Sequence, residues 1–149
     1  MKIVIVSDSH GNNKALDEIA LIHQDADLFL HAGDSEADEY SIMPFESVKG
    51  NCDYCNDAPM RKIIDTPYGK LLMQHYPTMP YDIINQYHIK IFVHGHTHVR
   101  KKMLQNGLLI LNPGGLSYAR DKYDMSYMVL YIDNKHVKVE FKSLLDEKH

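Results

Sequence analysis

Short apolar runs, rich in β-branched residues, recur along the chain and are separated by polar or glycine-containing segments. In the first third these runs predict strands buried on both faces, because they lack an alternating polar face. Between the first two runs Leu16, Ile19 and Ala20 recur at helical spacing, which predicts a helix capped by an asparagine. The elements predicted here are strands over Lys2–Val6, Asp27–His31 and Phe45–Lys49, a helix from Asn12 or Asn13 to about Gln24, and a short helix or turn over Ser35–Tyr40.

The rest of the chain changes to strands joined by short turns. Thr66-Pro67-Tyr68-Gly69 is a good hairpin turn, and Asn106-Gly107 is the strongest two-residue hairpin signal. Early βαβ units followed by hairpins predict an α/β domain with one central sheet or two stacked sheets, and with helices on the outer faces. The predicted elements are strands over Arg61–Asp65, Lys70–Gln74, Lys90–Val93, Lys101–Gln105, Leu108–Leu111, Met125–Ile132 and Val137–Lys142, and a short helix over Met79–Tyr87.

Length and charge narrow the classes of function. A chain of 149 residues favours a single domain over residues 1–149. The formal net charge of -4 argues against broad attraction to nucleic acid, but it leaves an anionic substrate open because bound metal ions dominate a local field. No apolar run is long enough to span a bilayer and no signal peptide precedes the first strand, so we expect a cytoplasmic protein without a membrane partner.

Residue types that bind metal ions collect where predicted strands end. The carboxyl ends of strands in α/β sheets converge on one crevice, so clusters far apart in sequence are expected to meet there. Carboxylate, amide and imidazole ligands without thiolate suit manganese, iron, cobalt, nickel or zinc. Seven ligands are more than one tetrahedral ion can bind, and they fit two ions that share a bridging carboxylate. Any one of these residues on its own would be interpreted as an ordinary polar loop residue. The seven are Asp8, His10, Asp34, Asn51, His75, His96 and His98.

The order of these clusters resembles the signature of calcineurin-like metallophosphoesterases. The resemblance implies a β-sandwich of two mixed sheets flanked by helices. It also implies two divalent metal ions, for which manganese is the leading candidate. Asp8, His10 and His98 would hold the first of these ions. Asn51, His75 and His96 would hold the second ion, and Asp34 would bridge the two. The matching segments are Asp8-Ser9-His10-Gly11-Asn12, Gly33-Asp34, Gly50-Asn51-Cys52-Asp53, His75 and Gly95-His96-Thr97-His98, and Asn112-Pro113-Gly114-Gly115 adds a likeness to the small bacterial and archaeal phosphodiesterase branch.

Two positions depart from that family's pattern. Cys52 stands where many members have a histidine that protonates the leaving group, and a thiol is a poor substitute. Esters with good leaving groups are therefore expected to react fastest. Tyr76 stands where a glycine usually follows the histidine matched by His75, and it could narrow the pocket, stack against a substrate base, or simply pack.

Several other residues have two possible roles, one in function and one in structure. Asn12 and Arg120 could touch a substrate phosphate, or be a helix cap and an exposed loop charge. His31 and His94 could donate to a carboxylate ligand, although such residues are more often satisfied core histidines. Cys52 and Cys55 form a lone C-x-x-C, which by default is two unpaired thiols rather than a redox or zinc site.

The function predicted is a two-metal phosphodiesterase that hydrolyses small phosphodiesters by attack of a metal-bridging hydroxide. Phosphomonoesterase and pyrophosphatase activity are the neighbouring alternatives. A different alternative is a non-catalytic protein-binding scaffold, because some relatives lose the ligands and act in the retromer complex. The substrate, the physiological metal and any homo-oligomer are left open by the sequence.

Overall fold

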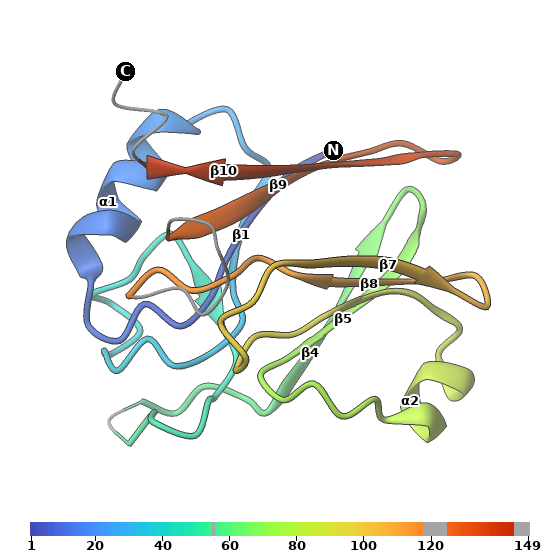
Figure 1. The fold of residues 1–149 in the computed structure, drawn as a ribbon, viewed down its shortest axis with the longest axis horizontal. Helices are drawn as coiled ribbons and strands as arrows, with labels where there is room; N and C mark the ends of the chain where they lie inside the picture. The colour runs from blue at the N-terminus through green and yellow to red at the C-terminus, as the bar shows by residue number, and fades with distance from the viewer. Residues whose placement is uncertain (55, 118–124, 145–149) are drawn as a thin grey trace.

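A computed structural model describes residues 1–54, 56–117 and 125–144 and shows two five-stranded mixed sheets (Figure 1). In chain order the elements are β1 (Lys2–Val6), α1 (Asn13–Ile22), β2 (Leu28–His31), β3 (Glu46–Ser47), β4 (Arg61–Thr66), β5 (Gly69–Gln74), α2 (Tyr81–Gln86), β6 (Ile89–Val93), β7 (Lys101–Gln105), β8 (Leu108–Asn112), β9 (Ser126–Ile132) and β10 (Val137–Ser143). One sheet has the order β10-β9-β1-β2-β3 and the other the order β4-β5-β6-β8-β7.

The two sheets face each other across the main core, and each carries one helix on its outer face. Ile5 of β1 and Met73 of β5 belong to the same buried cluster between the sheets. Val4, on the other side of β1, packs with Leu16 of α1, and Ile84 of α2 packs on the outer side of β6. Strands covered on both faces need apolar residues at every position, which explains the unbroken apolar runs. The predicted sandwich flanked by helices is confirmed.

Parallel pairing brings the important loops to one end of the sandwich. β1 pairs in parallel with β2, with Val6 opposite His31, and β5 pairs in parallel with β6, with Met73 opposite Val93. The segments after these four strands therefore leave the sheets at their carboxyl ends. Six of the predicted ligands lie on these segments, and the seventh, Asn51, follows β3, which is parallel to β2.

Both predicted hairpin turns are confirmed. Thr66 pairs with Gly69 across a two-residue turn. Asn106 and Gly107 both have positive φ, 50° and 79°, which is the backbone of a type I′ turn. Among the described residues no helix is long and apolar enough to cross a membrane.

Two predicted boundaries are wrong. The first helix ends at Ile22 rather than near Gln24, because His23 leaves helical geometry and its ring bonds the Tyr127 hydroxyl at 2.8 Å. The third strand is only Glu46–Ser47, because the chain then turns toward the following loop, where the Lys49 amide donates to a loop carbonyl. The acidic segment 35–40, predicted as a short helix or turn, is irregular and ends in a turn.

Candidate metal centre

The loops after β1 and β2 run side by side and continue the parallel pairing beyond the strands. The amides of Asp8 and His10 donate to the carbonyls of Gly33 and Asp34 at 3.0 and 2.9 Å. These bonds fix the two loops against each other. The side chains of Asp8, His10 and Asp34 are thereby directed into one space.

Left-handed backbone is concentrated at this end of the molecule. Such a conformation costs an L-residue about 1–2 kcal/mol, so it persists only where the surroundings impose it. Left-handed turns, rather than extended chain, bring together the side chains that lie two residues apart in these loops. The ligand candidates with positive φ are Asp8 (54°), His10 (43°), Asp34 (62°), His96 (70°) and His98 (62°).

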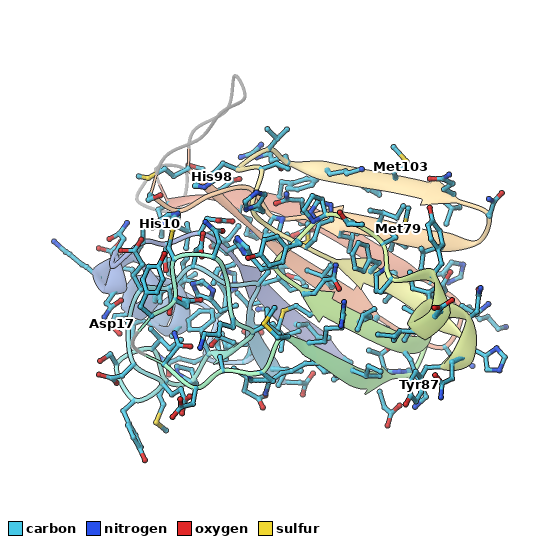
Figure 2. All side chains as sticks on the ribbon, turned by 90° about the horizontal axis from the view of Figure 1, so that it is seen from below. His10, Asp17, Met79, Tyr87, His98 and Met103 are labelled. Atoms are coloured by element: carbon cyan, nitrogen blue, oxygen red, sulfur yellow. The ribbon has the colours of Figure 1, made fainter. Side chains whose placement is uncertain are left out.

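Asp8, His10 and His98 form one group of potential ligands. Oδ1 of Asp8 lies 3.4 Å from Nε2 of His98 and 3.9 Å from Nε2 of His10, and the two rings stack at a centroid distance of 5.4 Å. Figure 2 shows His10 and His98 near each other at one end of the sandwich. Asp8 is fully buried, and its Oδ1 accepts no hydrogen bond within the described part of the chain. A buried carboxylate oxygen in this position fits a cation site.

Asn51, His75 and His96 form a second, tighter group. Oδ1 of Asn51 lies 2.9 Å from Nε2 of His75 and 3.1 Å from Nδ1 of His96, and those two nitrogens are 3.2 Å apart. Nδ1 of His75 donates to the Ala32 carbonyl at 2.8 Å, because a carbonyl can only accept. The lone pair of Nε2 in the neutral ring then faces the group, as in a metal-binding histidine.

Asp34 lies between the two groups. Its Oδ2 is 3.2 Å from Nε2 of His75 and 3.8 Å from Nε2 of His10, while its Oδ1 accepts from the Cys52 amide at 2.8 Å. Burial favours the protonated acid, but hydrogen bonds from His75 and Cys52 outweigh it and hold the pKa of Asp34 below its usual value. The structure thus brings all seven predicted ligand residues together, with Asp34 in contact with both groups.

The negative charges of Asp8 and Asp34 favour a positive charge at the ring of His75. Burial alone would lower the pKa of this ring, but the hydrogen bond to Asp34 and the charge of Asp8 outweigh burial and raise it. The same field favours a divalent ion, which would compete with a proton for Nε2.

Two residues whose roles the sequence did not indicate hold the ligands in place. Glu36 accepts a 2.7 Å hydrogen bond from Nδ1 of His10. Asp53 is buried and accepts three backbone amides, those of Asp34 and Gly50 at one oxygen and that of Glu36 at the other. In the sequence, Asp53 stood out only as the last residue of the Gly50-Asn51-Cys52-Asp53 motif. Glu36 was only one residue of an acidic stretch, and nothing in the sequence indicated a contact with His10.

Gly95 allows β1 and the loop after β6 to touch. A Cβ built on Gly95 would lie 2.7 Å from Oδ2 of Asp8 and would collide with Oγ of Ser7. With no side chain there, the next amide, that of His96, donates to Asp8 Oδ2 at 3.0 Å. Close approach of backbone to the carboxylate is therefore the reason for this glycine.

A family model for the calcineurin-like phosphoesterase superfamily domain matches residues 1–135. The chain belongs to this superfamily. The probable metallophosphoesterase YsnB of Bacillus subtilis is 30% identical to it, over 95% of this chain and 90% of YsnB. The resemblance inferred from the ordered motifs is confirmed, and the chain is a metallophosphoesterase of a family that uses divalent metal ions.

Solved structures agree on the metallophosphoesterase fold. A conserved protein of Streptococcus pneumoniae, described as a predicted phosphoesterase, superposes with a TM-score of 0.85 at 28% identity, over 95% of this chain and 88% of that chain. Vps29 of Entamoeba histolytica, in complex with zinc, gives a TM-score of 0.70 at 19% identity, over 95% and 98% of the two chains. At that identity the second likeness shows the fold alone.

Neither buried histidine near the metallophosphoesterase ligands bonds a carboxylate within the described residues. His31 donates from Nε2 to Oγ of Ser9 at 2.8 Å and accepts the Gly33 amide at Nδ1, and burial lowers the pKa of its ring to about 4. His94 donates from Nδ1 to the Gly95 carbonyl at 3.1 Å. Of the two roles considered for these histidines, contact with a carboxylate is contradicted for both, whereas His31 is a hydrogen-bonded core histidine that supports the ligand-bearing loops.

Among the remaining predicted residues, the structure describes Asn12 and Cys52. Asn12 is the N-cap of α1, and its Nδ2 also donates to the Leu116 carbonyl at 3.0 Å, so contact with a substrate phosphate stays a prediction. Burial and the nearby Asp34 raise the pKa of the Cys52 thiol, which therefore stays protonated near neutral pH. Arg120 and Cys55 lie outside the described residues.

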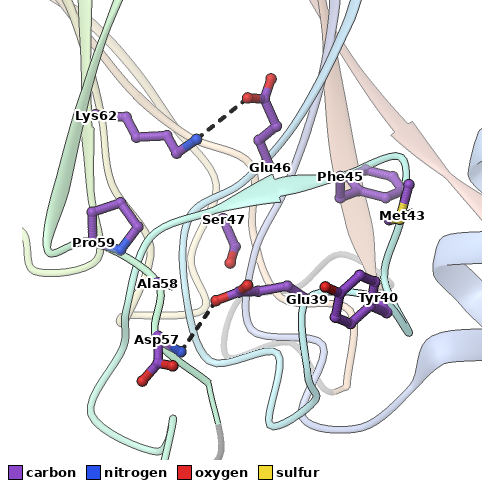
Figure 3. A pocket seen from close by; sticks show the side chains of 10 residues that line it. All are labelled: Glu39, Tyr40, Met43, Phe45, Glu46, Ser47, Asp57, Ala58, Pro59 and Lys62. Atoms are coloured by element: carbon purple, nitrogen blue, oxygen red, sulfur yellow. Dashed lines mark hydrogen bonds and ion pairs between the residues drawn. The ribbon is translucent and has the colours of Figure 1, made fainter.

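A separate hollow of about 440 Å³ opens beside β3 and β4 (Figure 3). Two polar contacts lie within it: Lys62 pairs with Glu46 at 3.3 Å, and the Asp57 amide donates to Glu39 at 3.1 Å. None of the seven ligand candidates lines it. The lining residues are Glu39, Tyr40, Met43, Phe45, Glu46, Ser47, Asp57, Ala58, Pro59 and Lys62.

Proposed function

We propose that residues 1–149 form one catalytic domain, a two-metal phosphodiesterase acting on small phosphodiesters. The observation that carries the proposal is the convergence of buried carboxylate oxygens and imidazole nitrogens from separate loops on one small space. Oδ1 of Asp8, Oδ2 of Asp34 and Nε2 of His75 belong to one such group. Carboxylate and imidazole ligands crowded together in this way favour cations between them.

In this proposal each group holds one ion. Asp8, His10 and His98 hold the first, Asn51, His75 and His96 hold the second, and Asp34 is shared. When bound, the two ions lower the pKa of a water molecule that serves as nucleophile and neutralise charge on the phosphate. Manganese is the first candidate, and iron, nickel, cobalt and zinc suit the same ligands.

The protein's own residues orient these ligands. The Ala32 carbonyl fixes the tautomer of His75, and the Cys52 amide turns one oxygen of Asp34 away from the groups, leaving the other to face both. Ligands held in advance lose little freedom when an ion binds, which favours tight and well-ordered coordination.

The leaving group receives little help from Cys52. Its thiol pKa is raised, and a weak acid transfers a proton slowly at neutral pH. We therefore expect aryl and nucleotidyl esters to react faster than alkyl esters. The test is a series of phosphodiesters with leaving groups of increasing pKa, for which the rate should fall steadily. A flat series would mean that another group supplies the proton.

A protein-binding scaffold is the second candidate, because a solved structure of Vps29 shares this fold. The complete set of ligand-competent side chains favours the enzyme. Metal-stripped protein should be reconstituted with each candidate metal, and bound ions counted while hydrolysis of bis(p-nitrophenyl) phosphate is followed. We expect two ions per chain and activity in wild type and in the exposed control Asp65→Asn, and loss of both in Asp34→Ala. Fewer than one ion per chain would favour the scaffold.

A further inference from the structure

The ring of Tyr76 borders the second group of ligands. Its centroid lies 5.3 Å from the ring of His75, at an interplanar angle of 80°, and 5.4 Å from the ring of His96, at 47°. Tyr76 thus touches two potential metal ligands from outside the cluster. The ring is not within a buried core, because 37% of the residue is exposed.

Tyr76 lies on a solvent-facing side of the site. Asp8 and His75 are fully buried, whereas Asn51 is exposed and His96 is half-buried. A substrate phosphate that approaches the second group of ligands from this side brings the groups esterified to it beside the rim that Tyr76 shares with His96.

The backbone that carries Tyr76 is held rigidly. Gln74 is 4% exposed, and its Nε2 donates both to the Tyr76 carbonyl at 2.7 Å and to the Thr78 carbonyl at 2.8 Å. The side-chain oxygen of Gln74 accepts from Nε of Arg61 at 2.8 Å. This buried amide uses both of its hydrogens to fix the loop after β5. A ring on a fixed loop offers a stacking face at little entropic cost.

We propose that the Tyr76 ring is the binding face for a flat aromatic group on the substrate, a nucleobase or an aryl ring esterified to the phosphate. The inference rests on the proposed function, since it assigns a substrate class to the same site. Aromatic groups stack on tyrosine through their faces, and a nucleobase and an aryl ring share this property. The site would then select esters by the retained group as well as by the leaving group.

The test keeps the leaving group constant and changes the retained group. Methyl, phenyl and thymidine 5′ esters of p-nitrophenyl phosphate are compared in the manganese-loaded protein. We expect kcat/KM for the phenyl and thymidine esters to exceed that for the methyl ester by roughly tenfold. This ratio should fall close to one in Tyr76→Ala and persist in Tyr76→Phe, because the ring face is kept. The thymidine and phenyl arms separate a nucleobase preference from a general aryl preference.

The matched control is Tyr131→Ala, since Tyr131 is also 37% exposed but lies on β9, between Lys2 and Lys138. It should leave the ratio at the wild-type value. A wild-type ratio near one, or a ratio unchanged in Tyr76→Ala, would overturn the inference.

A binding measurement decides the inference separately from the reaction. Calorimetry should show phenylphosphonate binding roughly tenfold more tightly than methylphosphonate, with the difference lost in Tyr76→Ala and kept in Tyr76→Phe. If no ester is hydrolysed, the proposed function fails while this arm still tests Tyr76. If all esters are hydrolysed and the two phosphonates bind equally, the proposed function stands and the role of Tyr76 fails.

Discussion

Glu36 and His10, 26 residues apart, are joined by a 2.7 Å hydrogen bond between Oε1 of the carboxylate and Nδ1 of the ring. The carboxylate accepts, so Nδ1 carries the proton and Nε2 turns its lone pair toward Asp8 and Asp34. Glu36 itself has a φ of 53°, and its amide donates to Asp53 at 2.9 Å, which holds this unfavourable conformation. The relationship explains how a partly exposed histidine is oriented for metal binding.

Replacing Glu36 with alanine should weaken binding of the first ion by about 10- to 100-fold, the usual effect of removing a residue that orients a metal-binding histidine. Glu36→Gln should lie between alanine and wild type, because its amide oxygen still accepts from His10 but carries no charge. Manganese titration followed by calorimetry measures both. Glu46→Ala removes an exposed carboxylate that pairs with Lys62 and is the control. Wild-type affinity in Glu36→Ala would contradict the prediction.

Asp53→Asn should lower the free energy of unfolding by about 2–4 kcal/mol, because an amide cannot accept all three backbone hydrogens that the carboxylate now accepts. It should also lose metal, since the loops carrying Asp34 and Asn51 are both fixed by this side chain. Urea unfolding and metal analysis test the two effects. Asp57→Asn alters an exposed carboxylate four residues later and should change neither. A fully stable Asp53→Asn would show that the amides find other acceptors.

Gly95→Ala should abolish metal binding, because the new methyl group would lie 2.7 Å from Oδ2 of Asp8 and push that carboxylate away. Gly107→Ala is the matched control. Its methyl group would meet nothing within 4 Å, but its φ of 79° disfavours alanine, so we expect a loss of about 1 kcal/mol of stability with metal binding intact. Equal metal binding in the two variants would rule out the steric explanation.

His31 should make the metal-free protein less stable in acid. The pKa of this buried ring is about 4 in the folded protein and near 6.5 when unfolded, so below pH 6.5 the unfolded chain takes up a proton that the folded chain refuses. The free energy of unfolding should fall by about 2 kcal/mol between pH 7 and pH 5 from this residue, and level off below pH 4.

Urea unfolding of wild type and His31→Gln at pH 7 and pH 5, both in chelator, isolates this effect. The variant has no titrating group at this position but keeps the other histidines. The fall in its free energy of unfolding between pH 7 and pH 5 should therefore be smaller than that of wild type by about 2 kcal/mol. Because the variant also disturbs the bond to Ser9, only the difference between the two pH values is compared. Parallel pH dependence in the two proteins would show that His31 titrates normally.

The sequence by itself determined the features that depend on near neighbours. Asn106-Gly107 predicts its turn because only such residues adopt two successive positive φ values at low cost. Apolar runs ending in Asp8, Asp34 or His96 predict which strands carry the ligand types to one end. Sequence patterns alone did not decide between one sheet and two; the family resemblance implied the sandwich that the structure shows.

Only the tertiary structure decided how these residues meet. The left-handed backbone at Asp8 and His10 is unfavourable in isolation and exists because the loop after β2 bonds against it. The contacts of Glu36 with His10, and of Asp53 with three amides, join loops that no local pattern links. Such contacts depend on strand register and on the interactions of the whole fold, and these outweigh the preferences of individual residues.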